Sequence, residues 1–337
     1  MRGRGLLVLG AAIAALVLAE LALPQLLNRY YLTIVVRILV AVLAATSLQL
    51  VNGFTGQFSI GHAGFMAVGA YVSAAFSVFV GGHWLATLQG ALPAELARLL
   101  YFPLPLLAGG LVASLAGLVV GVPTLRLRGD YLAIATLGFG EIIRIAILNV
   151  DAVGGARGFS LAAPPGVDLR YEGIGLIGAV VALSLFVMAR LVYASGGLAF
   201  RAVREDEVAA EAMGIPTTRV KVEAFVVASF FAGVAGALFA HAEGYVHTNS
   251  FGFVRSFELV AFVVLGGLGS LTGAALAAAV LTAAPELLRG LGEWRMILYS
   301  ILIIATMILR PQGLMGSREL SLRRLRRRPA AVAEAGS

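Results

Sequence analysis

Long, nearly uninterrupted apolar stretches recur along most of the chain. They are continuous rather than alternating, which is typical of helices that cross hydrocarbon and not of the strands of an outer-membrane barrel. Most of them reach the length of about 20 residues that a helix needs to span a bilayer. We expect membrane spans at 5–23, 31–51, 57–80, 104–125, 131–149, 173–193, 222–242, 257–267, 271–288 and 295–309.

Two of these segments leave alternatives open. Segment 257–267 is too short to cross upright, so it is either a tilted, packed span or a re-entrant segment enclosed by protein. Segment 5–23 follows two arginines, a pattern shared with cleavable signal peptides. Because no clean small-x-small site precedes Pro24, we favour a retained membrane anchor. The pattern therefore predicts a helical bundle of about ten spans.

Composition places the chain in a bilayer. Of its 337 residues, 60% are hydrophobic and only 13% are charged, and the mean hydropathy is +0.94. A soluble domain carries about 25% charged residues, so this chain cannot cover itself with a water-facing surface. We therefore expect an all-α integral membrane protein. The absence of cysteine from the sequence excludes disulfides, thiolate metal sites and cysteine nucleophiles.

The distribution of basic residues predicts the orientation. Cytoplasmic loops collect Lys and Arg, and most of the 25 basic residues lie inside if the N-terminus is inside and the chain crosses ten times. Both termini are then cytoplasmic. This also holds if the two adjacent segments within 257–288, the doublet, form a re-entrant hairpin instead of two spans. The net charge of +7 reports this orientation rather than a nucleic-acid partner. We expect a membrane domain over 1–318, with a cytoplasmic loop at 194–221, and a basic cytoplasmic tail over 319–337.

Residues 194–221 form the long polar loop between spans on the cytoplasmic side. A helix over 199–213 is amphipathic, with an apolar face of Ala199, Val203, Ala210 and Met213. Its polar face carries Arg201, Arg204, Glu205, Glu207 and Glu211. Ser195 is a candidate N-cap, Gly214 stands at the C-cap position and Pro216 stops the helix. The segment is either a solvated helix at the membrane interface or a docking surface for another protein.

Two glycine-rich segments are candidates for a path through the membrane. In 52–71 polar side chains gather within a short stretch, and a polar group in the bilayer is costly unless it has a partner. The candidates there are Asn52, Gly53, Gln57, Ser59, Gly61 and His62. In the second segment a helix is interrupted by Gly266, Gly267, Gly269 and Ser270. Transporters use interrupted helices to bind polar ligands near the midplane of the membrane. The alternatives are helix packing through small residues for the first segment and a tight turn for the second.

Charged and histidine side chains in or near the spans give weaker signals. Glu141 and Arg144 are three residues apart on a helix and can pair. Three other charges have no partner visible in the sequence: Glu20, Arg37 and Glu258. Three histidines, without metal-ligand spacing, are expected at the outer interface: His83, His241 and His247.

The loop sequence REDEVAAEAMGIP at 204–216 resembles the glutamate-alanine-alanine-glycine loop of ABC importer permeases, in the version of branched-chain amino acid importers. Four further segments resemble the same family in the same order: NGFTGQFSIGHAGFMAVGAY at 52–71, RGDYLAIATLGFGEIIR at 128–144, VLGGLGSLTG at 264–273 and RPQGL at 310–314. The resemblance covers roughly residues 40–315, and its form is similar to the M-type rather than the H-type permease. In GGARGFS at 154–160, relatives usually have a small residue and Asn where this chain has Ala156 and Arg157.

The resemblance implies that this chain is one permease subunit of an ATP-driven importer in the bacterial inner membrane. The loop would act as a coupling helix on a cytoplasmic ATPase through Arg201, Arg204, Glu205, Glu207, Glu211, Ala212 and Gly214. The implied partners are an H-type permease, ATPase subunits and a periplasmic substrate-binding protein. Branched-chain amino acids are the usual cargo, and urea, short amides or aromatic carboxylates are alternatives. Because the sequence shows no strong cluster of charged residues that could bind a carboxylate, we expect the carrier protein to provide most of the substrate recognition.

The chain itself is not expected to be an enzyme. It has no G-x-x-x-x-G-K-[ST] motif, and its only lysine, Lys221, stands outside any glycine-rich loop. ATP and Mg²⁺ would therefore be used by the partner ATPase, and this chain would bind no cofactor. An ion-coupled secondary transporter is less favoured, because no carboxylate cluster suggests a coupling-ion site. A membrane enzyme is disfavoured by the scattered histidines.

Overall fold

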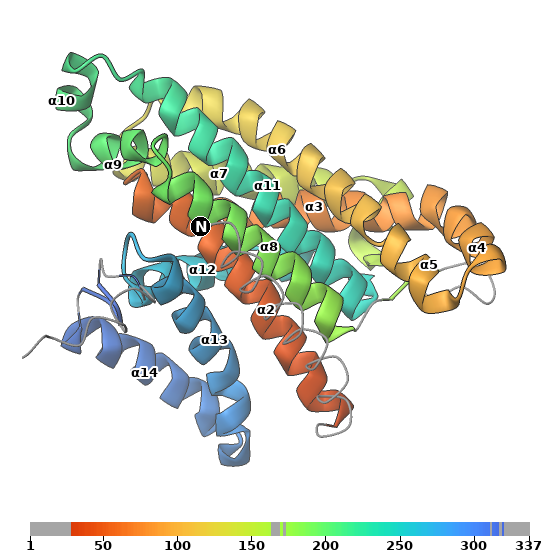
Figure 1. Cartoon of the computed structure of the whole chain (residues 1–337). Helices are drawn as coiled ribbons and strands as arrows, with labels where there is room; N and C mark the ends of the chain where they lie inside the picture. The colour runs from red at the N-terminus through yellow and green to blue at the C-terminus, as the bar shows by residue number, and fades with distance from the viewer. Residues whose placement is uncertain (1–27, 163–168, 171–172, 311, 317–318, 320–337) are drawn as a thin grey trace, which may run out of the picture.

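Helices make up nearly all of the regular structure in the computed structural model, which describes residues 28–162, 169–170, 173–310, 312–316 and 319 (Figure 1). The α-helices are α2 (Arg29–Gln49), α3 (His62–Phe76), α4 (Gly82–Ala91), α5 (Ala94–Tyr101), α6 (Pro103–Thr124), α7 (Asp130–Leu148), α8 (Ile174–Tyr193), α9 (Gly197–Glu205), α10 (Glu207–Ala212), α11 (Thr217–Glu243), α12 (Phe253–Gly266), α13 (Leu271–Leu287) and α14 (Trp294–Leu309). Two π-helical turns, η1 (Leu50–Phe54) and η2 (Ser77–Gly81), extend α2 and α3. The 3-10 turns are η3 (Asp151–Val153), η4 (Gly155–Arg157), η5 (Thr248–Phe251) and η6 (Leu288–Leu291). Strands β1 (Phe159–Ser160) and β2 (Tyr245–Val246) pair antiparallel, with Phe159 opposite Val246.

Eight helical segments within the described residues are long and apolar enough to cross a membrane. They are Arg29–Phe54, His62–Ala91, Leu96–Thr124, Asp130–Leu148, Ile174–Tyr193, Thr217–Glu243, Thr248–Gly266 and Leu271–Leu291. Helix α14 is a shorter apolar helix. The molecule is thus an all-α, multi-pass membrane protein. The expected span 5–23 and all but one residue of the tail 319–337 lie outside the described residues.

The segment expected as a span over 57–80 has different boundaries. Residues 55–61 form an irregular connection, and α3 begins only at His62. Gly56 has φ +69°, a conformation that interrupts the helix and that glycine adopts without the strain of a Cβ. At the other end the helical path continues beyond 80 through η2 and α4 to Ala91.

Helices α12 and α13 form the doublet, and its first member is longer than the expected 257–267. The 3-10 turn η5 precedes α12, so the helical segment Thr248–Gly266 reaches 19 residues. The apolar pattern misses its first turns because Arg255 and Glu258 interrupt it. In the structure these two side chains pair with each other, at 2.6 Å between nitrogen and oxygen. A tight turn at 267–270 then leads directly into α13.

Helix α11 packs against α2, α3 and α6 and lies at the centre of the bundle (Figure 1). Glycines allow backbone contact where the helices cross. A Cβ at Gly69 of α3 would lie 2.1 Å from the carbonyl oxygen of Gly233 of α11, and one at Gly109 of α6 would lie 2.6 Å from that of Gly69. Small residues at such crossings let membrane helices approach closely. These three helices therefore form one tightly packed unit.

Several charges within the spans form ion pairs, either along one helix or between helices. Glu141 and Arg144 form the expected pair, at 2.7 Å. Arg37 of α2 pairs with Glu243 at the end of α11, 206 residues away in the sequence. Separation in sequence is the reason that this partner could not be recognised. The expectation that Glu258 has no partner visible in the sequence is wrong, because Arg255 stands three residues before it on the same helix and pairs with it. Glu20 lies outside the described residues.

The expectation that His241 is an interfacial residue is wrong. This side chain is fully buried near the end of α11, and its ring nitrogens lie 3.2 Å from Ser73 Oγ and 2.9 Å from Ser77 Oγ. Neighbouring helices surround the end of α11 and replace the headgroup region as the polar partner of the imidazole. His83 is exposed and His247 is partly exposed.

We expect Gly69→Ala to lower the thermal stability of the purified protein, because the added methyl group would meet the Gly233 backbone. Overpacking of a close contact costs about 1–3 kcal/mol. The melting temperature, measured in detergent by size-exclusion chromatography after heating, should fall by several degrees. As a matched control, Gly138→Ala on α7 adds the same methyl group where nothing lies within 4 Å. Equal melting temperatures for the two variants would contradict the backbone contact.

Candidate functional site

The loop between α8 and α11 contains two short helices instead of the single expected helix over 199–213. Helix α9 ends at Glu205, and Asp206 is extended, with φ −157° and ψ 112°. The Asp206 carboxylate accepts hydrogen bonds from the backbone N–H groups of Val208 and Ala209, at 2.9 and 3.0 Å, and so caps the N-terminus of α10. An aspartate offers the backbone an alternative to helix continuation, and its place on the otherwise apolar face was the signal for this break.

The end of α10 follows the expectation closely. Gly214 has φ +83°, its N–H donates to the Glu211 carbonyl at 2.9 Å, and the Ile215 N–H donates to the Ala210 carbonyl at 3.0 Å. This pair of bonds is a Schellman motif, which stops a helix at a glycine. Pro216 follows as the residue before α11. At the other end of the loop Ser195 does not cap α9, whose N-cap position is held by Gly196.

The predicted polar face is divided between inward and outward side chains. Glu207 contacts Lys221 at the start of α11 and lies 3.5 Å from Arg128. Arg204 donates from Nη1 to the Gly53 carbonyl at 3.0 Å. Glu205 and Glu211 are exposed. Of the five expected charged residues, two thus fasten the loop to the bundle. Arg201 is exposed and donates to the Val192 carbonyl at 3.5 Å.

Apolar side chains of the loop are divided in the same way. Phe200, Val203 and Ala210 pack against Val220 and Ala224 of α11 in a small core of their own. The other large apolar side chains of the loop are exposed, and these are Leu198, 62% exposed, Val208, 65% exposed, and Met213, 83% exposed. Met213 was expected on the same apolar face as Val203, but it stands after the last residue of α10 and is exposed. We call Leu198, Val208 and Met213 the loop surface.

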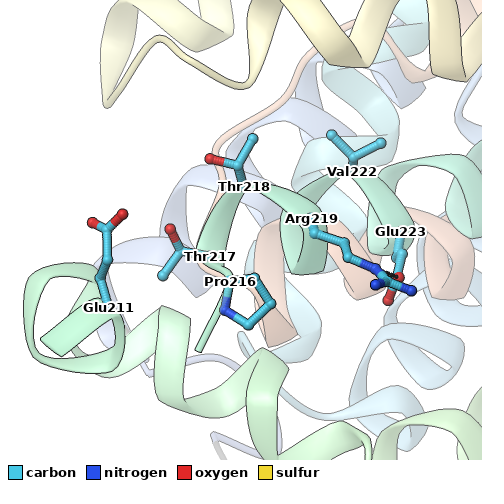
Figure 2. Close-up of a pocket in the computed structure, with 7 residues that line it drawn as sticks. All are labelled: Glu211, Pro216, Thr217, Thr218, Arg219, Val222 and Glu223. Carbon is cyan, nitrogen blue, oxygen red and sulfur yellow. Dashed lines mark hydrogen bonds and ion pairs between the residues drawn. The ribbon is translucent and has the colours of Figure 1, made fainter. Parts of the chain in front are cut away.

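An open hollow of 480 Å³ lies between α10 and the first two turns of α11 (Figure 2). Its lining residues are Glu211, Pro216, Thr217, Thr218, Arg219, Val222 and Glu223. Figure 2 shows the Glu211 carboxylate on one side and the Arg219–Glu223 pair, at 2.7 Å, on the other. The hollow offers charges of both signs around an apolar floor, which suits a protein surface better than a small ligand.

Arg204 joins the loop to both glycine-rich segments at once. Besides its bond to Gly53, its side chain packs over Gly56, where an added Cβ would lie 3.2 Å from Arg204 Cγ. A Cβ at Gly269 would lie 2.3 Å from Arg204 Nη1. Gln49 completes the contact, because its Nε2 donates to the carbonyls of Gly267 at 2.8 Å and Ser270 at 3.2 Å. Three segments that the sequence singled out separately therefore meet at one junction.

Several residues expected on a translocation path have structural partners in this chain. Asn52 lies in the π-helical turn η1 and exchanges two hydrogen bonds with the backbone of Ser59, at 3.2 and 3.1 Å. The ring of His62 lies 2.7 Å from Ser47 Oγ. Gly61 allows close approach to the Thr136 carbonyl, 2.1 Å from an added Cβ. These contacts support the packing alternative for this part of 52–71.

Two other side chains of this segment have no such partners. Gln57 is 6% exposed and Ser59 is 1% exposed. Neither the amide group of Gln57 nor the hydroxyl of Ser59 has a hydrogen-bond partner among the residues that the structure describes. An unsatisfied buried polar group costs about 1–3 kcal/mol, so these two positions remain the candidates for contact with something that passes through the protein.

The second glycine-rich segment forms a tight turn between two helices, which was the alternative interpretation of this segment. Gly267 and Gly269 have φ values of +107° and +90°. Ser270 Oγ caps α13 by accepting from the Gly273 N–H at 3.0 Å. The turn lies beside Arg204 of α9, so it stands at the loop end of the bundle and not half-way along it.

Two residues of the junction were missed by sequence reasoning. Gln49 stands just before the segment 52–71, and its signal was a lone amide within an apolar stretch. Lys221 was noted only as the chain's one lysine, yet it is 6% exposed and pairs with Glu207. Within the described ranges no group of three His, Cys, Asp or Glu residues could hold a metal ion.

Comparison with known proteins identifies the family to which this chain is similar. The family model described as branched-chain amino acid transport system, permease component, matches residues 30–309. The chain belongs to this permease family. It is 37% identical over 333 residues to the high-affinity branched-chain amino acid transport system permease protein LivM of Salmonella typhimurium, covering 89% of this chain and 73% of that protein. It is also 37% identical to LivM of Escherichia coli, covering 90% and 74%.

The H-type permeases of the same systems are more distant relatives of this permease. LivH of Salmonella typhimurium is 25% identical over 295 residues, covering 82% of this chain and 92% of that protein. The higher identity to LivM confirms the expected resemblance to the M-type. No solved structure matches the chain significantly.

For this permease we expect Arg204→Ala to loosen the junction without unfolding the bundle. A hydrogen bond from a charged group contributes about 1.5–3 kcal/mol, so amide hydrogen exchange in residues 207–213 and 266–270 should accelerate about tenfold or more. Exchange is measured by mass spectrometry on the purified protein. Arg219→Ala removes an equivalent charge from a surface pair on α11 and should leave these amides unchanged. Unchanged exchange in the Arg204 variant would show that the loop is held by its apolar contacts and the Glu207–Lys221 pair without Arg204.

Proposed function

We propose that this chain is the M-type permease subunit of an ATP-driven importer that moves branched-chain amino acids across a bacterial inner membrane. Its partners would be an H-type permease, cytoplasmic ATPase subunits that use ATP and Mg²⁺, and a periplasmic substrate-binding protein. The proposal is supported by family membership and by the loop, which combines an exposed apolar surface with a firm attachment to the bundle. A secondary transporter would have no use for such a loop.

The loop surface supports contact with an ATPase. Leu198, Val208 and Met213 expose apolar side chains next to charged Glu205 and Glu211. Apolar centres with polar rims are the common anatomy of protein interfaces. The charges would fix the orientation of the partner, and the apolar side chains would supply most of the affinity.

The attachment of the loop supports its role in coupling. Helix α10 is followed at once by the Schellman turn and then by α11, the 27-residue helix at the centre of the bundle. Arg204 connects the same loop to α2 and to the α12–α13 turn. A displacement of the loop by a bound ATPase would therefore be passed to three separate parts of the bundle.

In the proposed topology the loop end of the bundle lies in the cytoplasm. Helix α11 then leads outward, α12 returns, α13 leads outward again and α14 brings the chain back inside. With a crossing at 5–23, the chain would make ten crossings and have both termini in the cytoplasm. In this arrangement the α12–α13 doublet reaches the cytoplasmic side with its turn rather than re-entering half-way.

We expect Val208→Glu to abolish co-purification of the ATPase. The tagged chain is co-expressed with its chromosomal neighbours, and the complex is isolated in detergent and examined by mass spectrometry. A carboxylate at a position 65% exposed need not disturb the fold, but it would be buried unpaired in the interface. The ATPase should be retained by the parent chain and reduced more than tenfold in the variant.

The control carries the same substitution at the opposite end of the bundle. Val150→Glu, at a position 46% exposed after α7, should retain the ATPase. The parent complex in proteoliposomes should import labelled leucine only with ATP and the binding protein. Import by the purified chain alone would contradict the proposal and favour an ion-coupled transporter. Import of urea or an amide in place of leucine would keep the importer and change its cargo.

A further inference from the structure

A cleft of 440 Å³ opens between α2, α11, α12 and α13 at the end of the bundle opposite the loop. It is lined by Arg37, Val40, Phe239, Glu243, Tyr245, Ser250, Arg255 and Thr282. Charges of both signs, hydroxyl groups and an apolar wall thus face one small volume. Most of these residues lie between 239 and 255, whereas Arg37 and Val40 of α2 and Thr282 of α13 are distant in the sequence, which is why no charge cluster was visible there.

The central pair of the cleft is Arg37 with Glu243. The Arg37 Nε donates to Glu243 Oε1 at 2.7 Å, and Nη2 donates to Oε2 at 3.3 Å. This fork uses two of the five guanidinium N–H groups and one lone pair of each carboxylate oxygen. The side chains are 49% and 26% exposed, so their remaining donors and acceptors are open to the cleft.

A second guanidinium stands on another wall. Arg255 of α12 donates from Nη1 to Glu258 Oε2 at 2.6 Å, is 23% exposed and lines the cleft together with Arg37. Thr282 also lines the cleft, but its hydroxyl oxygen is itself buried and has no hydrogen-bond partner in the described part of the chain. Two guanidinium groups are suited to a carboxylate, and Glu243 is suited to an ammonium group.

The remaining wall is apolar. Val40 and Phe239 line the same volume, one turn along the helix from Arg37 and from Glu243 respectively. An α-amino acid presents a carboxylate and an ammonium group on adjacent positions and, in the branched-chain class, an aliphatic side chain. All three parts of such a molecule find a matching group in the cleft.

We propose that this cleft is an entry site in which the permease itself binds the zwitterionic amino acid after its release from the carrier protein. The inference rests on the proposed function for its orientation and cargo. The neighbouring loop at 154–160 is part of the entrance, because Tyr245 of the cleft donates to the Arg157 carbonyl at 2.6 Å and β1 pairs with β2. The unusual Arg157 therefore stands where it can affect which amino acids enter.

The test exchanges the charges of the central pair. In the double variant Arg37→Glu with Glu243→Arg, an ion pair can form again, so a merely structural role is preserved. A site for a zwitterion is not preserved, because each end of the bound amino acid would meet a charge of its own sign. The introduced carboxylate on α2 would repel the carboxylate of the ligand, and the introduced guanidinium on α11 would repel its ammonium group. The variant is made in the complete importer and reconstituted with its ATPase and carrier protein.

Binding is measured directly with photo-leucine, a leucine analogue with a diazirine in its side chain, on the reconstituted importer without the carrier protein. In the parent, cross-links should map to the peptides around Val40 and Phe239, and excess leucine should suppress them. The exchanged variant should lose these cross-links and import leucine at least about tenfold more slowly, while the complex retains the same amount of ATPase subunit as the parent.

The matched control is the exchange Glu141→Arg with Arg144→Glu, an in-span pair with the same 2.7 Å separation. It should change neither labelling nor import. Import near the parent rate in the Arg37/Glu243 exchange, or labelling that survives it or lies elsewhere, would overturn the entry site. Such a result leaves the proposed function intact if the parent imports leucine, whereas a parent that imports no leucine with ATP and carrier overturns both.

Discussion

Backbone that leaves the helical conformation inside a membrane protein must find its hydrogen bonds within the protein, because lipid offers none. This chain has two such places side by side, the π-helical turn η1 with the connection at 55–61, and the turn at 267–270. Gln49 and Arg204 supply the donors that these turns require, at Gly267, Ser270 and Gly53. The position of the loop and the course of α2 and α12 all depend on these few bonds.

The consequence for the loop is that its charged residues have two different roles. Arg204 and Glu207 use their charges inside the molecule, whereas Glu205 and Glu211 keep theirs on the surface. A helical-wheel view assigns all of them to one face, since it assumes an unbroken helix. The capped break at Asp206 divides the segment into two helices, so these charged side chains no longer share one face.

The sequence predicted well those features that depend on residues close together in the chain. Continuous apolar stretches gave most of the spans, the Glu141–Arg144 spacing gave an ion pair, and Gly214 gave the end of α10. What it could not predict depends on tertiary contacts. Arg37 finds Glu243 only because α2 packs against α11, and His241 is buried only because other helices surround it. The start of α12 was missed for a local reason, because Arg255 and Glu258 interrupt the apolar pattern although they pair with each other on one helix.

The glycine contacts of α3, α6 and α11 also determine how the molecule can move. Where Gly69, Gly109 and Gly233 meet, the helices approach so closely that backbone lies against backbone, with only small side chains such as Ser73 and Ala113 nearby. We therefore expect the three helices to move as a single block. The cleft has one wall on that block, through Glu243 and Phe239, and its other walls include α2, α12 and α13. A tilt of the block against these helices changes the width of the cleft without any rearrangement inside either part.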